Sequence, residues 1–413
     1  MTAQTVEETL DTVFRMESAR IIATVARIVR DVGIAEEIAQ DALVAALEQW
    51  PRAGVPDRPG AWLTATAKHR AVDLVRRRET YARKLAEAGR ELTESAYDPE
   101  PSGPGDIDDD VLRLVFTTCH PVLSAEARTA LTLRLLGGLR TDEIARAFLV
   151  PEPTVAARIT RAKRTLAKSG VEFEVPYGED RAARLGSVLE VIYLIFNEGY
   201  AATAGDDLLR PALCEDALRL ARVLAALMPR EGEVHGLAAL LEIQASRTAA
   251  RTGPDGQPVL LADQDRRRWD RLLIRRGYAA LERAVAADGA TGPYALQAAI
   301  AACHARAARY EETDWATIAA LYRRLAAVAP SPVVELNRAV AVSMAEGPEA
   351  GLALVDALAA EPALDRYHLL PSVRGDLLAR LGREAEARAE FARAAELTRN
   401  ERERALLLRR AAG

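Results

Sequence analysis

The feature that most constrains this chain is an apolar period of about 3.6 residues that recurs over almost its whole length. Apolar residues stand three and four positions apart, alternating runs of β-branched residues are almost absent, and only 5% of the residues are aromatic. A chain of 413 residues is too long for one ordinary hydrophobic core. We therefore predict an all-α protein with two or three domains.

Two breaks in the helical pattern divide the chain. Residues 93–110, TESAYDPEPSGPGDIDDD, combine proline, glycine and serine with an acidic run. The segment VEFEVPYGED at 171–180 interrupts the pattern again. The sequence predicts a helical domain at 8–90, a flexible linker at 91–110, a small helical domain at 111–170 and a large helical domain at 181–413.

Composition excludes several classes of protein. Cys119, Cys214 and Cys303 lack the spacing of a metal site or a disulfide pair. No signal sequence, long apolar run, phosphate-binding glycine loop or nucleophile motif appears, and we interpret the adjacent Cys119 and His120 as core packing. We expect a cytoplasmic protein that is not an enzyme, with no metal, cofactor or membrane segment. Its net charge of -5 leaves a local DNA-binding surface open.

A helix-turn-helix is predicted within residues 124–168. Thr141 would cap a first helix that reaches Phe148, LVPE would form the turn, and Pro153 suits the start of a second helix. The apolar face of that second helix carries Val155, Ile159, Ala162 and Leu166. Its opposite face carries the residues predicted to contact DNA, which are Thr154, Arg158, Arg161, Arg164, Thr165 and Lys168. A solvated basic face is the alternative.

Three segments carry a family resemblance. AEEIAQDAL (35–43) resembles the core-binding helix of sigma domain two, and AWLTATAKHRAVDLVRRR (61–78) resembles a signature of extracytoplasmic-function sigma factors. The segment 123–166, which contains the helix-turn-helix, is similar to sigma domain four. VIYLIFNEGYAAT and SPVVELNRAVAV, further along, resemble the subgroup with a tetratricopeptide-type C-terminal extension.

The resemblance implies a sigma factor that binds the β′ and β subunits of core RNA polymerase and directs transcription initiation at promoter DNA. The residues implied to dock on the polymerase are Glu36, Glu37, Gln40 and Asp41. Those implied to face the minus-ten promoter element are Thr66, His69, Asp73, Arg76 and Arg77. The basic face of the helix-turn-helix would read the minus-thirty-five element. Trp62 either stacks on a base or packs beneath the loop 52–60, and we favour packing.

Two positions depart from the family pattern. His69 stands where most relatives have asparagine, so its contact with DNA is either different or absent. Leu149, Val150 and Pro151 replace the usual Gly-Ile-Ser turn, so the second helix of the helix-turn-helix loses a serine cap.

The last domain shows tetratricopeptide-like spacing. Small and aromatic positions at Gly375, Ala387, Phe391 and Ala394 recur about 34 residues upstream at Ala341, Ala353, Ala357 and Ala360. Chance spacing in an alanine-rich bundle is the alternative. Asn197, Glu198 and Tyr200 follow a very apolar helix segment, where they either satisfy backbone groups or form a regulatory interface for a protein partner.

The resemblance implies that this extension regulates the factor. A stand-alone helix-turn-helix regulator and a tetratricopeptide-type interaction scaffold with a DNA-tethering front end remain alternatives. The AEEIAQDAL helix is the discriminating feature, because a stand-alone regulator has no use for a polymerase-binding helix.

Overall fold

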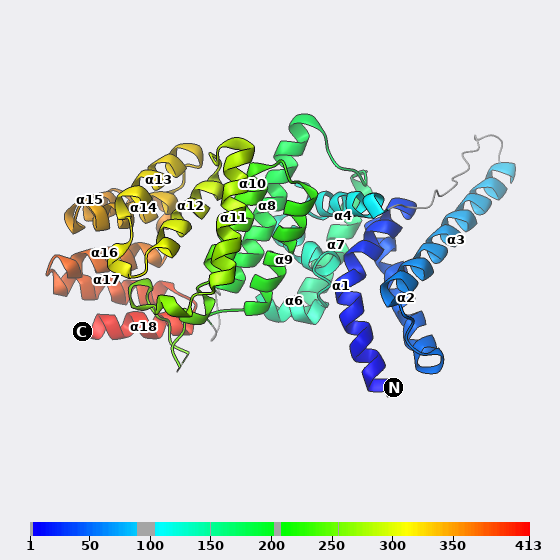
Figure 1. The fold of residues 1–413 in the computed structure, drawn as a ribbon, viewed down its shortest axis with the longest axis horizontal. Helices are drawn as coiled ribbons and strands as arrows, with labels where there is room; N and C mark the ends of the chain where they lie inside the picture. Colours follow the sequence, from blue (N-terminus) through cyan, green and yellow to red (C-terminus); the bar gives the residue numbers. More distant parts are fainter. Residues whose placement is uncertain (1–2, 89–103, 149, 202–207, 255) are drawn as a thin grey trace. The chain divides into compact units, whose positions relative to one another are not determined.

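The computed structural model describes residues 3–88, 104–148, 150–201, 208–254 and 256–413 (Figure 1). Within these ranges the regular elements are helices, and the strand-like pairing is limited to an isolated bridge between Thr252 and Pro258. This confirms the all-α prediction. None of the helices in this part of the chain is both long and apolar enough to cross a membrane.

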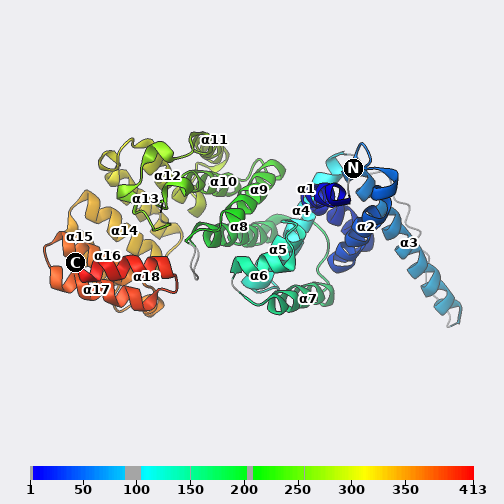
Figure 2. The ribbon, with the colours of Figure 1, turned by 90° about the horizontal axis from the view of Figure 1, so that it is seen from below.

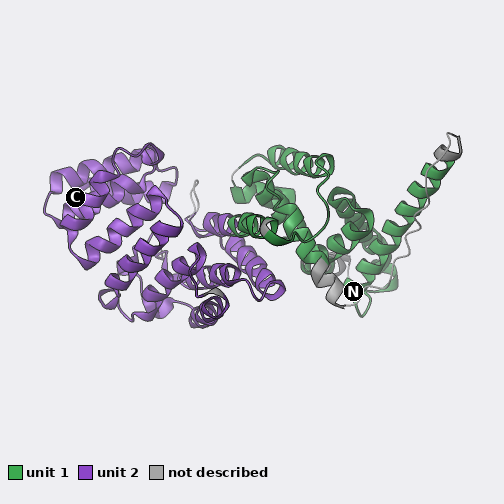
Figure 3. Ribbon diagram, turned by 90° about the horizontal axis from the view of Figure 1, so that it is seen from above, with its two compact units in different colours: residues 1–192 green, residues 193–413 purple. Residues whose placement is uncertain are grey.

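The chain divides into two compact units, Met1–Ile192 and Tyr193–Gly413 (Figure 3). The boundary between them falls inside helix α8, Gly178–Tyr200. The other helices of the first unit are α1 (Ala3–Val29), α2 (Val32–Ala53), α3 (Pro59–Ala88), α4 (Pro104–Thr118), α5 (Ala125–Leu135), α6 (Thr141–Phe148) and α7 (Glu152–Lys168).

Helices α1, α2 and α3 pack together around small side chains. Ala39 and Ala46 of α2 and Ala67 of α3 are almost fully buried, which allows the helix backbones to approach closely. Asp31 caps α2, since its carboxylate accepts hydrogen bonds from the backbone N–H groups of Gly33 and Ile34 at 2.7 and 3.0 Å. The last turns of α3 extend beyond α1 and α2, where residues 76–84 are exposed (Figure 2).

The predicted flexible linker at 91–110 is wrong at its C-terminal end, because helix α4 already begins there. The helix begins at Pro104, so the segment 91–110 is not irregular throughout, and its residues 91–103 lie outside the described part of the chain. Asp110 is fully buried, because Arg27 of α1 and Arg113 of α4 bind its carboxylate at 2.9 and 2.6 Å. An acidic run therefore ends in a buried ion-pair cluster rather than in solvent, which the composition of the segment did not reveal.

The second unit is a succession of helices, most of them joined by short turns or single-turn 3-10 helices, with a longer connection between α10 and α11. Its α-helices after α8 are α9 (Pro211–Leu227), α10 (Gly232–Ala245), α11 (Arg271–Asp288), α12 (Pro293–Arg306), α13 (Trp315–Val328), α14 (Pro332–Ala345), α15 (Pro348–Ala357), α16 (Leu369–Arg380), α17 (Glu384–Leu397) and α18 (Glu401–Ala412).

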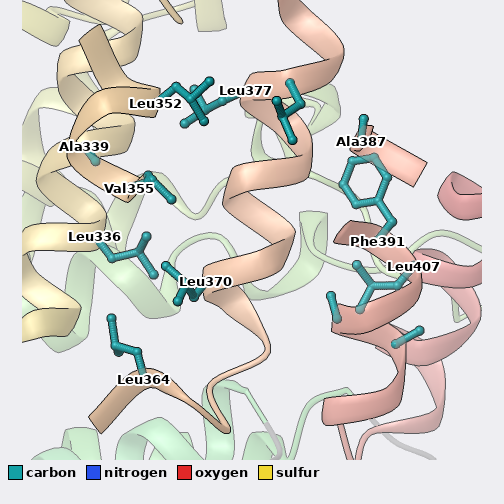
Figure 4. Packing of buried hydrophobic residues seen from close by; sticks show 13 residues of the cluster. Leu336, Ala339, Leu352, Val355, Leu364, Leu370, Leu377, Ala387, Phe391 and Leu407 are labelled. Carbon is teal, nitrogen blue, oxygen red and sulfur yellow. The ribbon is translucent and has the colours of Figure 1, made fainter. Parts of the chain in front are cut away.

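The last five helices share one hydrophobic cluster (Figure 4). Leu336 of α14 and Leu370 of α16 face each other in it (Figure 4). The ring of Phe391 lies beside Gly375 of α16. A Cβ atom on Gly375 would stand only 2.7 Å from the Cε1 atom of Phe391. This close approach accounts for the predicted pairing of a glycine with an aromatic residue in the repeat.

The upstream copy of the repeat has a different register from the predicted one. Ala341 is buried as expected, but Ala353, Ala357 and Ala360 are exposed. The close contact between α14 and α15 is made instead at Gly351, where a Cβ atom would lie 2.4 Å from the Cβ atom of Ser343. The turn between α14 and α15 is shorter than the turn between α16 and α17, so a fixed repeat period misplaces the buried positions.

His304 of α12 lies in the interior of the second unit. Its imidazole meets the ring of Trp315 edge to face, with the ring centroids 5.1 Å apart. Burial, together with the guanidiniums of Arg247 and Arg266, lowers the pKa of His304 to about 4. The folded chain therefore keeps this ring neutral at pH values where an unfolded chain would protonate it.

We predict that His304 makes the second unit sensitive to acid. Below an unfolded pKa of 6.5 the unfolded chain gains a proton that the folded chain does not, so stability falls from about pH 6.5 to about pH 4, by at most about 3 kcal/mol. The His304→Gln variant should lose less stability over this interval. Urea denaturation in a Trp50→Phe, Trp62→Phe background leaves Trp269 and Trp315 as reporters. An equal loss in both proteins would contradict this assignment.

Candidate nucleic-acid interface

Helices α6 and α7 form the predicted helix-turn-helix. Helix α6 spans Thr141–Phe148, as predicted, but its cap differs, since Arg140 occupies the capping position and its backbone N–H donates to the Glu143 carboxylate at 2.7 Å. A glutamate three residues into the helix thus replaces the expected Thr141 cap. Helix α7 follows Pro151, which makes no side-chain cap hydrogen bond. Leu149 of the departing turn lies outside the described residues.

The two faces of α7 separate as the sequence predicts. Val155, Ile159, Ala162 and Leu166 are buried against the other helices of the small domain. Of the predicted DNA-contacting residues, Arg161, Arg164 and Lys168 are exposed, whereas Thr154, Arg158 and Thr165 are half-buried. This face therefore presents cationic donors to solvent on a helix whose other side is fixed by packing, which is the arrangement that a groove-binding helix requires.

The exposed face of α3 carries the residues predicted for the minus-ten element. His69, Asp73, Arg76 and Arg77 are exposed, and Thr66 is half-buried. Trp62 packs against Trp50 of α2 with ring centroids 5.6 Å apart in an edge-to-face geometry. This contact favours the packing interpretation of Trp62 over base stacking.

Helix α2 presents only part of its predicted carboxylate face. Glu37 and Asp41 are exposed, and Asp41 lies 3.3 Å from the guanidinium of Arg70 on α3. Glu36 differs from the prediction, because it is only 4% exposed. Gln40 is half-buried and donates a hydrogen bond to Oε1 of Glu36 at 2.9 Å.

The partners of Glu36 come from the small helical domain that contains the helix-turn-helix. Nε of Arg134 on α5 donates to Oε1 of Glu36 at 2.5 Å, and Nζ of Lys163 on α7 forms an ion pair with Oε2. Sequence reasoning missed both cations, since Lys163 was assigned no role and Arg134 stands far from Glu36 along the chain. A carboxylate removed from water needs such partners, because its desolvation costs several kcal/mol.

The polar residues at the end of α8 are largely engaged. Glu198 is buried and forms an ion pair with Arg210. Tyr200 stacks on Phe196, and the guanidinium of Arg251 covers its ring at 3.8 Å while donating to its backbone carbonyl. Asn197 is half-buried. The contact of Glu198 with Arg210 is thus with an arginine side chain rather than with a backbone group, and Tyr200 holds the Arg251 guanidinium in place.

The buried thiol next to His120 is held within the core. Cys119 is 1% exposed and lies 3.4 Å from the Thr132 hydroxyl. Burial raises the pKa of this thiol, so it remains protonated, and a protonated thiol is a poor nucleophile. Among the residues that the structure describes, no cluster of three histidine, cysteine, aspartate or glutamate side chains could hold a metal ion.

Comparison with known proteins identifies three regions of this chain. Residues 13–80 match the family described as Sigma-70 region 2, residues 113–166 match Sigma-70, region 4, and residues 184–285 match a family of unknown function named DUF6596. An uncharacterized protein of Rhizobium meliloti (strain 1021) is 46% identical over 386 residues, which cover 92% of this chain and 90% of that protein.

We predict that replacing Glu36 loosens the contact between α2 and α7. The Glu36→Gln variant leaves two half-buried cations without a negative charge, and should lower the local free energy of opening by about 2 kcal/mol. Hydrogen exchange of amides in α2 and α7 of the full chain measures this change. The exposed neighbour provides the control, since Glu37→Gln should change it by less than about 0.5 kcal/mol. Equal protection in both variants would show that the buried cluster is unimportant.

Proposed function

Because the chain belongs to the sigma-70 family, among the sigma factors of the extracytoplasmic-function kind with a C-terminal helical extension, we propose that α2, α3 and α7 provide its polymerase and promoter contacts. Sigma factors act in promoter-specific transcription initiation, and the sigma domains point to a transcription regulator rather than an enzyme. The observation that carries the proposal is the match of two regions of the chain to Sigma-70 region 2 and region 4. Within these regions α2 exposes carboxylates toward the proposed polymerase contact, and α3 and α7 expose arginines toward the proposed DNA contacts.

The basic face of α7 is proposed to read the minus-thirty-five element. Arg161 and Arg164 can reach guanine edges or phosphates, and Thr154 and Thr165 can reach phosphates or thymine methyl groups. Arg158 and Lys168 extend the same face. The buried stripe of α7 supports this assignment, because it fixes the orientation of the arginines toward solvent.

The face of α3 that carries Thr66, His69, Asp73, Arg76 and Arg77 is proposed to meet the minus-ten element. Arg76 and Arg77 stand on exposed turns, where they supply positive charge for a backbone contact. Extruding a base from the duplex costs a few kcal/mol, which such contacts must offset.

The exposed carboxylates Glu37 and Asp41 of α2 are proposed to dock on core RNA polymerase, with Gln40 beside them. Glu36 can join them only after it leaves Arg134 and Lys163, so polymerase binding through the whole face requires α2 and α7 to separate. We therefore regard the arrangement seen here as the free form of the factor. A stand-alone regulator would bind promoter DNA without polymerase, and a scaffold with a DNA-tethering front end would also bind DNA without binding core polymerase.

Arg161→Ala is expected to weaken promoter-specific transcription. Loss of one base-contacting arginine should cost about 1 to 3 kcal/mol of binding free energy and relax specificity at one promoter position. In vitro transcription with core polymerase and a promoter library measures both effects. Arg146→Ala, an exposed arginine of α6 paired with Asp142, should leave transcription unchanged. An Arg161→Ala protein with an unaltered start-site profile would contradict the assignment of α7.

The C-terminal extension is proposed to modulate the activity of the factor. Helix α8 begins in the first unit, where Ser187 donates to the backbone carbonyl of Cys119 at 2.6 Å and Glu190 pairs with Arg128 at 3.2 Å. The same helix ends in the second unit with Asn197, Glu198 and Tyr200. A conformational change at the C-terminal end of α8 can therefore pass along this continuous helix to the domain that contains α7.

A chain that stops after residue 200 should keep its α8 contacts with α5 and still transcribe at a different rate from the full chain. Circular dichroism melting checks that the shortened protein folds. The control is the Arg161→Ala change in the shortened chain, which should reduce transcription as in the full chain. Equal rates for a folded shortened chain and the full chain would remove the modulatory role of the extension.

A further inference from the structure

A pocket of about 260 Å³ lies within the second unit. It is bounded by the segment 247–264, by α16 and by α18. Its polar wall includes Arg247, Arg251 and Arg410, and its apolar wall includes Leu260, Leu369 and Leu407. None of the polymerase or promoter contacts proposed above uses these residues.

Two carboxylates of the pocket are already paired. Asp376 binds Arg410, whose guanidinium also lies 4.0 Å from the centre of the Phe391 ring. Glu403 lies 3.2 Å from Nε2 of His368 and accepts a hydrogen bond from the Thr398 hydroxyl at 3.0 Å. These interactions hold the two carboxylates in place in the lining of the pocket.

The other two arginines have no such partner. Arg247 contacts amide oxygens only, at 3.4 Å from Gln264 and 3.3 Å from Gln244, and its guanidinium lies over the Trp269 ring. Arg251 donates to the Tyr200 carbonyl and lies over the Tyr200 ring. Among the described residues, neither guanidinium forms an ion pair with a carboxylate, although both are half-buried.

Burial makes this positive charge costly. Burial lowers the pKa of Arg251, and the neighbouring positive charge of Arg247 lowers this pKa further. The negative charge of Glu403 raises the same pKa, but Glu403 lies beyond ion-pair distance of Arg251. Two half-buried guanidiniums that form no ion pair with a described carboxylate favour an anion that can reach them, because they would form charge-assisted hydrogen bonds with it. A leucine wall opposite them favours a ligand with an apolar body.

We propose that this pocket binds a small organic anion, with its acidic group between Arg247 and Arg251 and a short apolar body against Leu260, Leu369 and Leu407. The volume is below the usual range for drug-sized molecules, which suits a small ligand. Tyr200 acts as a positioning residue, because it holds Arg251 at the pocket wall. The pocket thus gives the polar end of α8 a role in ligand binding.

Isothermal titration calorimetry on the full chain tests this proposal with four probes: hexanoate, hexyl phosphate, the uncharged hexanamide and inorganic phosphate. Hexanoate or hexyl phosphate should bind saturably, hexanamide should not, and inorganic phosphate should bind more weakly than hexyl phosphate. Binding is measured without polymerase or DNA, so its failure and the failure of the proposed transcription role are distinguishable.

Two variants and a control locate the site. Arg247→Gln and Leu260→Asn, which replaces a leucine that is 44% exposed, should each weaken binding about tenfold, corresponding to about 1.4 kcal/mol. Arg267→Gln is the control, because Arg267 is exposed and pairs with Asp265 outside the pocket. No saturable binding of either anionic probe would overturn the proposal, as would equal binding of hexanamide or wild-type affinity in Arg247→Gln.

Discussion

The buried carboxylate of Glu36 ties the two small helical domains of the first unit together. It comes from α2, while the cations that neutralise it, Arg134 and Lys163, come from α5 and α7. A carboxylate at 4% exposure is stable only while these partners remain in place. Helices α2 and α7 therefore restrain each other through this ion pair.

The helical period was sufficient to predict much of the first unit. It placed α6 at its observed bounds and separated the buried stripe of α7 from its basic face. It could not tell which of two adjacent glutamates turns inward, since Glu36 and Glu37 differ by one helical step and the deciding cations lie far along the chain. For the same reason an acidic segment concealed the buried Asp110, whose main partner, Arg27, belongs to α1.

In the second unit, the local packing of the helices determines contacts that the sequence pattern did not predict. The repeat spacing singled out Gly375 and Phe391 as a small and an aromatic position, and the structure brings the two into contact, whereas the close contact at Gly351 lay outside the predicted positions. The pocket had no signal in the sequence, because its arginines and leucines come from segments as far apart as residues 247 and 410. Tyr200 was singled out by sequence, and the structure shows what it holds, the guanidinium of Arg251.

The most direct test of this account is the distance between α2 and α7 in solution. Spin labels at Glu48→Cys and Ala167→Cys occupy exposed positions, and the native cysteines are buried. Pulsed electron resonance should give one short distance for the free chain and a longer one after core polymerase is added. Lys163→Met should populate the longer distance without polymerase. An unchanged distance in a chain fully bound to core polymerase would contradict the claim that Glu36 must leave its partners for polymerase to bind.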